Sequence, residues 1–286
     1  MPIRPGALLA VAALASTTVA RADDAPPEPP ARKLTWHAGA ESATPPSDAP
    51  APRQFQQERP FVHLMDPTTP AAGQVGVEYE VGAASGGANR SLPTSVVAPG
   101  VAHGFGASVG ATDRVAPFFL MRSLQAPGEA STGPWSGVAG VRWAVVPATA
   151  AGFRLTLAGA AMRDFAAGAG VFARAAASWD LGRVRLAANV HGERVFQSAR
   201  DGVDVLVMGG VSYRTLDVLR VGVEWVGQDV EESLASGAEG GARHYAGPTL
   251  ALDLWQGRAQ LVGGPAFGLT QQTPGLLGKL ALVASF

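Results

Sequence analysis

The chain has 286 residues, of which 47% are hydrophobic and 16% charged, and its formal net charge is -1. This balance gives no reason to expect a nucleic-acid partner, which a basic surface would attract. The sequence contains no cysteine, so disulfides, cysteine-type metal sites and lipid attachment to an N-terminal cysteine are excluded.

The N-terminus has the pattern of a secretory signal peptide. Arg4 supplies a positive charge, residues 6–19 are small and apolar, and Ala20-Arg21-Ala22 fits the small-x-small cleavage pattern. A membrane-spanning anchor would need about 20 apolar residues, and this run has only about 14. We therefore predict a signal peptide over residues 1–22 and export of the remainder.

Residues 23–70 have a different character. Pro26-Pro27 and Pro45-Pro46 stand among alanine, serine and acidic residues, a composition that disfavours both helix and sheet. We predict a proline-rich periplasmic linker. The apolar and aromatic residues Trp36, Phe61 and His63 leave open an alternative, in which part of this region docks onto a partner or enters the lumen as a plug.

From residue 71 to residue 286, apolar and polar positions alternate in blocks of about ten residues separated by turn signals. Val75, Val77 and Tyr79 fall on one face of the first block, and Glu78 and Glu80 fall on the other. The blocks cover residues 74–81, 101–109, 118–124, 137–145, 153–161, 171–179, 184–194, 203–213, 219–227, 245–254, 259–269 and 276–286. They predict an all-β fold, a transmembrane antiparallel up-and-down β-barrel of about 12 strands.

The connections and the aromatic residues favour a barrel over a water-soluble two-sheet sandwich. Short connections (110–114, 147–150, 180–182, 215–217, 256–257) alternate with a set that includes long ones (83–96, 125–133, 229–243), as expected when both termini lie in the periplasm. A soluble sheet would not place Val, Leu, Phe and Trp outward on every strand. Aromatic residues near strand ends suit an interfacial girdle: Trp143, Trp179, Tyr213, Trp225, Tyr245 and Trp255.

The last strand carries an assembly signal. Leu280, Leu282 and Phe286 share one face, and Phe286 ends the chain. This end resembles the C-terminal sorting signal of Gram-negative outer-membrane β-barrels, which implies an outer-membrane location, contact with outer-membrane lipids and recognition by the barrel-assembly machinery. Three short motifs, at residues 110–114, 245–248 and 267–269, look like those of an uncharacterised or transporter-like family of Gram-negative outer-membrane proteins that includes channels linked to phenol degradation.

Function is expected on the inward faces of the strands. The predicted pore-lining residues are Arg142, Arg154, Arg174, Arg183, Arg185, Arg220, Glu193, Glu224 and His191. Arg142, Arg154, Arg174 and Arg185 lie on consecutive strands and could form a positive track for anionic solutes. Alternatively, they pair with the acidic residues and hold the wall together.

We interpret the chain as a passive channel or transporter for small solutes, with anionic or amphipathic solutes as an open alternative. The alternative is a non-conducting structural or interaction barrel. An outer-membrane enzyme that modifies lipids is a third hypothesis, for which His191, Asn189 and Glu193 form the most suggestive group. Catalysis, a metal site and a cofactor are not expected, because no metal-ligand or nucleotide motif occurs. The solute and the oligomeric state stay open.

Overall fold

The computed structural model describes residues 59–65, 67–85, 100–125, 128, 132–147, 152–196, 203–228, 230, 243–270, 273 and 275–286. The strands in these ranges are β1 Val75–Ala84, β2 Gly100–Val109, β3 Val115–Gln125, β4 Gly133–Val146, β5 Phe153–Asp164, β6 Gly168–Leu181, β7 Val184–Val195, β8 Asp204–Leu216, β9 Leu219–Gln228, β10 Arg243–Leu254, β11 Ala259–Gly268 and β12 Leu276–Ser285. No helix within these ranges is long and apolar enough to cross a membrane.

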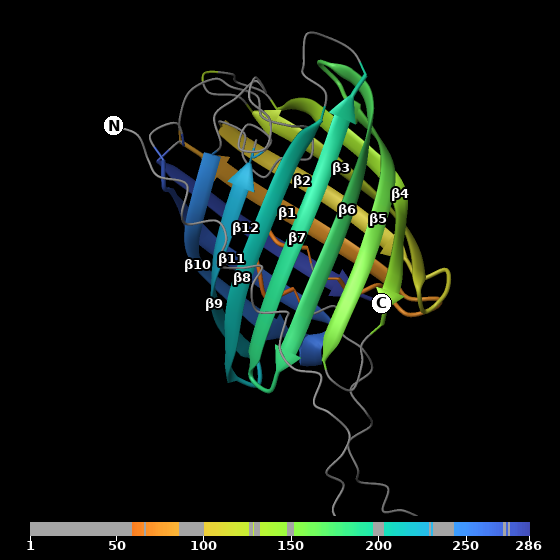
Figure 1. Cartoon of the computed structure of the whole chain (residues 1–286), viewed down its shortest axis with the longest axis vertical. Coiled ribbons are helices and arrows are strands. Elements are labelled where there is room, and N and C mark those ends of the chain that lie inside the picture. The colour runs from red at the N-terminus through yellow and green to blue at the C-terminus, as the bar shows by residue number, and fades with distance from the viewer. Residues whose placement is uncertain are drawn as a thin grey trace, which may run out of the picture. The chain divides into compact units, whose positions relative to one another are not determined.

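The strands close into a barrel in which each strand pairs antiparallel with its neighbours in the sequence (Figure 1). The first and last strands complete the ring, from Gly76 opposite Ser285 to Ala84 opposite Leu277. Because β1 pairs with β12, the backbone N–H and C=O groups of these two strands bond to each other. None of the described strands is therefore left with an unpaired edge. The prediction of an up-and-down barrel of about twelve strands is confirmed.

The outer surface of the barrel is apolar. In β12, Leu280 and Leu282 are exposed on the outside, whereas Ala281 and Val283 are buried inside. Each strand carries at least one large exposed apolar side chain, exemplified by Tyr79, Phe105, Met121, Val141, Leu157, Val171, Val190, Val211, Val223, Leu250, Phe267 and Leu280. Exposure of such a large apolar surface to water is unfavourable, whereas contact with the hydrocarbon layer of a membrane is favourable. The chain is therefore a membrane-spanning barrel of the outer-membrane type.

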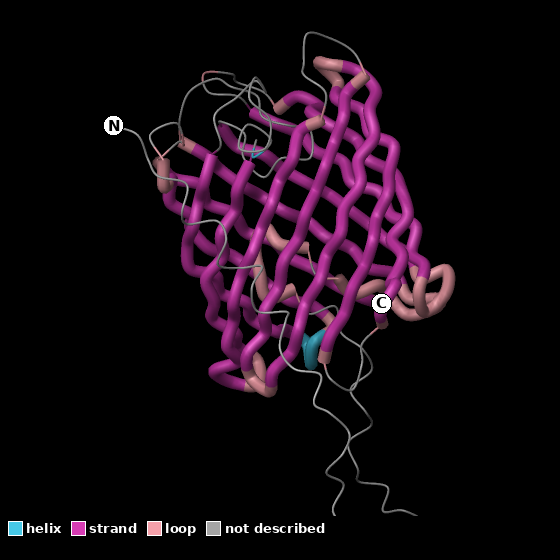
Figure 2. Tube along the Cα trace, in the orientation of Figure 1, coloured by secondary structure: helices cyan, strands magenta, loops and turns pink. Residues whose placement is uncertain are grey.

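One end of the barrel is built from tight connections (Figure 2). Two residues join β6 to β7 and β8 to β9, and a short 3-10 turn, η3 (Trp255–Gly257), leads from β10 to β11. Outer-membrane barrels have their short turns on the periplasmic side, so this end is assigned to the periplasm. It also holds the start of β1 and the end of β12, in agreement with the sequence prediction.

The aromatic girdle is confirmed in part. Trp143, Trp179 and Tyr213 are exposed on the outside close to the short turns. Trp255 is exposed in η3, and Trp225 stacks on His244 with ring centroids 5.6 Å apart. The prediction is wrong for Tyr245, which is fully buried, because it occupies an inward position of β10 and packs in an apolar cluster inside the barrel.

Candidate functional site: a peptide segment and a cationic cavity in the lumen

A stretch of chain that precedes β1 lies inside the barrel. We call residues 59–65 and 67–70 the lumen segment; it is neither helix nor strand. Phe61, Val62 and Leu64 are at most 2% exposed and are among the most buried of the described side chains. The lumen segment is the described part of the predicted linker or plug; residues 1–58, with the predicted signal peptide and Trp36, lie outside the described residues.

The lumen segment follows the inner wall from strand to strand. Its contacts, in chain order, are Arg59 N–H to Gln260 Oε1 on β11 at 2.6 Å, Thr249 on β10 to the Pro60 carbonyl at 3.4 Å, Asn189 on β7 to the Met65 carbonyl at 3.3 Å, and Thr156 on β5 to the Pro67 carbonyl. Just after the lumen segment, the Ala72 N–H donates to Asp113 Oδ1 in the β2–β3 turn at 3.2 Å. Polar groups from four strands therefore hold the described parts of the lumen segment.

Glu224 on β9 is the main anchor of this path. Its carboxylate accepts the backbone N–H groups of Val62 at 3.1 Å, of His63 at 2.8 Å and of Leu64. Glu224 is only 3% exposed, so these amides take the place of water around a buried acid. Arg59 adds a second tie, because its guanidinium pairs with Glu78 on β1 and donates to the Val62 carbonyl at 3.0 Å.

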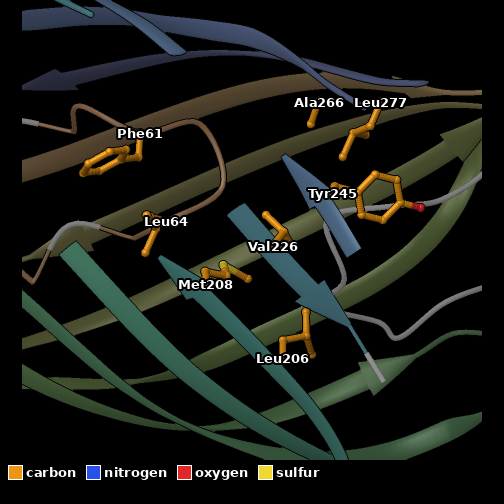
Figure 3. Close-up of a cluster of buried hydrophobic side chains, with 8 residues drawn as sticks. All are labelled: Phe61, Leu64, Leu206, Met208, Val226, Tyr245, Ala266 and Leu277. Atoms are coloured by element: carbon orange, nitrogen blue, oxygen red, sulfur yellow. The ribbon is translucent and has the colours of Figure 1, made fainter. Parts of the chain in front are cut away.

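Apolar contacts also hold the lumen segment against the barrel wall. Phe61 and Leu64 belong to one buried cluster with Met208 and Val226 of the wall (Figure 3). Gly210 on β8 leaves the room for them: a Cβ added there would lie 2.5 Å from Phe61 Cε1 and 2.8 Å from Leu64 Cδ1. Glycine at this position therefore makes room for the side chains of Phe61 and Leu64.

A cavity lies between the lumen segment and the opposite wall. It holds about 760 Å³ of empty space, part of it open to solvent. Five cationic side chains and two carboxylates line it: Arg59, Arg122, Arg142, Arg174, Lys279, Glu78 and Glu80. Glu80 is shared, since Arg122 approaches it to 2.9 Å and Lys279 to 2.6 Å. The lining is positive overall.

The predicted arginine track divides into two groups. Near the short turns, Arg154 Nη1 lies 2.8 Å from Asp180 Oδ2 and Arg185 Nε lies 2.5 Å from Asp180 Oδ1. These two arginines share a carboxylate and are absent from the cavity lining. Arg142 and Arg174 instead line the cavity, with the Arg142 guanidinium 4.7 Å from the centre of the Phe118 ring.

Arg174 belongs to a hydrogen-bonded chain with His191 and Glu193. Arg174 Nε donates to His191 Nδ1 at 3.2 Å, and His191 Nε2 lies 3.1 Å from Glu193 Oε2. The Phe172 ring stacks on His191 with centroids 5.0 Å apart. Both ring nitrogens of His191 are thus engaged, which favours a structural role over activation of a nucleophile.

The remaining predicted site residues are placed as follows. Arg220 is buried inside the barrel. Arg183 is exposed in the two-residue turn between β6 and β7, so it does not line the lumen wall as predicted. Phe286 is 80% exposed, and its backbone exchanges hydrogen bonds with Val75 at 2.9 and 3.0 Å where the barrel closes. Within the described residues no group of three or more His, Cys, Asp or Glu could hold a metal ion.

Sequence reasoning missed several residues of this site. The sequence pattern predicts a turn at Asp180, but β6 extends to Leu181 and brings the Asp180 carboxylate to both arginines. Phe118 and Phe172 share strand faces with Arg122 and Arg174, and this period-two spacing was an available signal. The role of Glu224 as an anchor carried no local signal, because its partners lie 160 to 162 residues away in the sequence.

Comparison with known proteins supports the fold. The sequence matches no family model and no curated protein. Among solved structures, it is similar to the KdgM porin, with a TM-score of 0.50 and 9% identity over 74% of this chain and 99% of that one. It is also similar to the NanC porin, with a TM-score of 0.51 and 8% identity over 73% of this chain and 98% of that one. At these identities the similarity concerns the barrel fold.

Proposed function

We propose that this outer-membrane barrel is a passive channel for small solutes with a preference for anions. The observation that carries this proposal is the cavity in the lumen, which five cationic side chains and two carboxylates line. A lumen with excess positive charge lowers the barrier for anions and raises it for cations. The porin fold and the apolar exterior support the location, and the outer-membrane lipids are the solvent of that exterior.

Arg142 and Arg174 are the residues through which this preference acts. Arg154 and Arg185, the other members of the predicted track, share the negative charge of Asp180. Arg122 and Lys279 share Glu80, and Arg59 pairs with Glu78. The Arg142 guanidinium lies over the Phe118 ring and the Arg174 guanidinium over the Phe172 ring, Arg174 also donates to His191, and both arginines line the cavity.

The test is ion selectivity in a planar bilayer. The reversal potential of the refolded chain in a KCl gradient should indicate anion preference, and Arg142→Gln with Arg174→Gln should shift it toward cations. Arg163→Gln is the matched control, because Arg163 is exposed on the outer side of β5 and should leave selectivity unchanged. An unshifted potential in the double variant would contradict the assignment.

The lumen segment is proposed to restrict the channel as a plug. Gly210→Val should displace Phe61 and Leu64 and raise the conductance, because the added side chain would occupy their space. Gly209→Val is the control: an added Cβ at Gly209 meets no atom within 4 Å, and this position faces the opposite side of β8. Equal conductance of the two variants would count against the plug.

A second function, a non-conducting barrel that serves structure or interaction, is favoured by the complete burial of Phe61, Val62 and Leu64. Conductance separates the two functions. If neither the native chain nor Gly210→Val conducts, while both are folded in the bilayer, the second function is the better one.

A further inference from the structure

The cavity combines two guanidinium groups with an apolar wall, and the barrel register shows how they come together. Arg142 on β4 lies opposite Ala158 on β5, which in turn lies opposite Arg174 on β6. The two arginines are therefore at one level of the barrel, two strand spacings or roughly 10 Å apart at the backbone. Between them stands only the methyl group of Ala158, so both long side chains can reach the same part of the cavity.

The neighbouring row, on the side of the longer connections, is built in the same way from aromatic rings. Phe118 on β3 and Phe172 on β6 are separated in register by Gly140 and Ala160. Over these small residues their ring centroids approach to 6.2 Å. Gly140 has no room for a side chain, since an added Cβ would lie 2.4 Å from the Ala160 Cβ.

Each arginine is held in place by this aromatic row. The Arg142 guanidinium lies 4.7 Å from the centre of the Phe118 ring, and that of Arg174 lies 5.4 Å from the centre of the Phe172 ring. His191 adds a hydrogen bond to Arg174 at 3.2 Å. A guanidinium whose plane is fixed in advance loses less conformational entropy when it forms paired hydrogen bonds with a carboxylate.

Beyond the rings the wall is apolar. Phe118 and Phe172 belong to a buried cluster with Val138, Met162 and Val195, against which Leu120 packs. Phe118, Leu120, Val138 and Phe172 also line the cavity. A solute whose charged end binds the two arginines would thus place its other end against these apolar side chains.

We infer that this cavity is a binding site for a small carboxylate with a compact apolar body. The carboxylate binds Arg142 and Arg174, and the apolar body lies against Phe118, Leu120 and Val138. An inorganic anion would leave the apolar wall unused. A polyhydroxylated acid in the same position would lose the hydration of its hydroxyl groups against Phe118, Leu120 and Val138, whose side chains form no hydrogen bonds. This inference specifies the solute class of the proposed channel and rests on the same cavity.

Equilibrium binding tests the inference independently of conduction. The refolded full-length chain in detergent micelles is titrated calorimetrically with cyclohexanecarboxylate, gluconate and cyclohexanol, and heats of transfer into empty micelles are subtracted. Saturable binding of cyclohexanecarboxylate is expected. Gluconate, which lacks the apolar body, and cyclohexanol, which lacks the carboxylate, should each bind at least about tenfold more weakly. Gluconate binding as tight as that of cyclohexanecarboxylate, or no saturable binding at all, would overturn the inference.

Three variants locate the site. Arg142→Gln with Arg174→Gln should weaken cyclohexanecarboxylate by at least about tenfold, since charge-assisted hydrogen bonds are lost. Val138→Thr keeps the shape of the side chain but adds a hydroxyl group, so the ratio of the affinities for cyclohexanecarboxylate and gluconate should fall. This variant tests the site if the double variant does not fold. Arg163→Gln should bind like the native chain. Unchanged binding in both cavity variants would refute the site.

The two proposals can fail separately. Anion-selective conductance without saturable carboxylate binding overturns this inference and leaves the channel intact. Saturable binding that requires Arg142 and Arg174 in a barrel that does not conduct supports the binding site and rejects the channel.

Discussion

At the scale of single residues, Glu224 shows how one acid can organise a peptide. Its carboxylate accepts three consecutive backbone N–H groups, from Val62, His63 and Leu64. An ionised carboxylate can accept several such hydrogen bonds at once, whereas an amide offers one oxygen and places two N–H donors against the same amides. The position therefore selects glutamate for its acceptors as well as for its charge.

Glu224→Gln should loosen the lumen segment without opening the barrel. Loss of charge-assisted hydrogen bonds costs about 2 kcal/mol, equivalent to roughly a thirtyfold change in an equilibrium constant. Hydrogen exchange read by mass spectrometry should show faster exchange in peptides that cover Val62 to Leu64, with exchange in β9 unchanged. Glu224→Asp is the control that keeps the charge. Equal protection of these amides in the Gln variant would show that Glu224 is not the anchor.

His63 should make the seating of the lumen segment depend on pH. Burial lowers its pKa well below the ordinary histidine value of 6.5, and the nearby Lys279 and Arg59 lower the pKa further. Glu80, which opposes this shift, is engaged by Arg122 and Lys279. A released His63 takes up a proton more readily than a seated one, so the seated state is most stable above pH 6.5 and loses stability as the pH falls below that value.

Acidification from pH 7.5 to pH 5 should accordingly speed hydrogen exchange in peptides that cover the lumen segment, after correction for the intrinsic pH dependence of exchange. His63→Gln should reduce this effect, because glutamine does not titrate; Glu224, which accepts the backbone N–H of His63, is another titratable group in contact with the lumen segment. A pH response of the same size in His63→Gln would assign the titration to another group.

At the scale of elements, β9 illustrates how strictly the two faces of a strand differ. Val223 is 55% exposed on the outside, and its neighbour Glu224 is buried inside. The inward Gly222 is confined as well: an added Cβ would lie 2.7 Å from the Val211 carbonyl oxygen. Facing the lumen therefore does not by itself make a position tolerant, and even a small side chain such as serine would be crowded there.

Val223→Arg should hinder insertion, since an arginine that faces lipid at mid-depth costs about 2 to 4 kcal/mol. The fraction of heat-modifiable, folded protein after refolding into lipid measures this effect on gel electrophoresis. Val223→Leu, which preserves the apolar surface, should fold like the native chain. Equal folding of the Arg and Leu variants would mean that Val223 does not contact lipid.

At the scale of the whole molecule, Phe286 pairs through its backbone in the closed barrel, and its ring is predicted to be part of an assembly signal. Its backbone pairs with Val75 where the barrel closes, and its side chain is exposed beyond the last strand. The first role belongs to the folded barrel, and the second fits the proposed recognition by the assembly machinery. Phe286→Ala removes the ring and keeps the backbone, whereas deletion removes both.

In cells, Phe286→Ala and the deletion should both lower the amount of heat-modifiable barrel in the outer membrane. In refolding without cellular factors, Phe286→Ala should match the native chain, and only the deletion should lower the yield. If Phe286→Ala is harmless in cells, the aromatic ring is not part of an assembly signal.

The wall of the barrel could be derived from the sequence because its signal is local. Side chains alternate with a period of two, so the faces of β1, β9 and β12 follow from their own residues once lipid is taken as the outer solvent. Errors arose where alternation runs into a strand end: Arg183 falls in a turn, and Tyr245, near the start of β10, faces inward and not toward the membrane interface.

The interior was decided only by the tertiary structure. The path of the lumen segment depends on partners such as Glu224 and Gln260, which lie 162 and 201 residues from the groups that they bind. The pairing of Arg154 and Arg185 with Asp180 likewise appears only when three strands are set side by side. The sequence alone determined the strands and which of their faces meets lipid, because a repeating local pattern and a single apolar solvent specify both. Which side chains are in contact inside the lumen could be determined only from the closed barrel. Side chains from many strands meet there, and no local sequence pattern indicates which of them become neighbours.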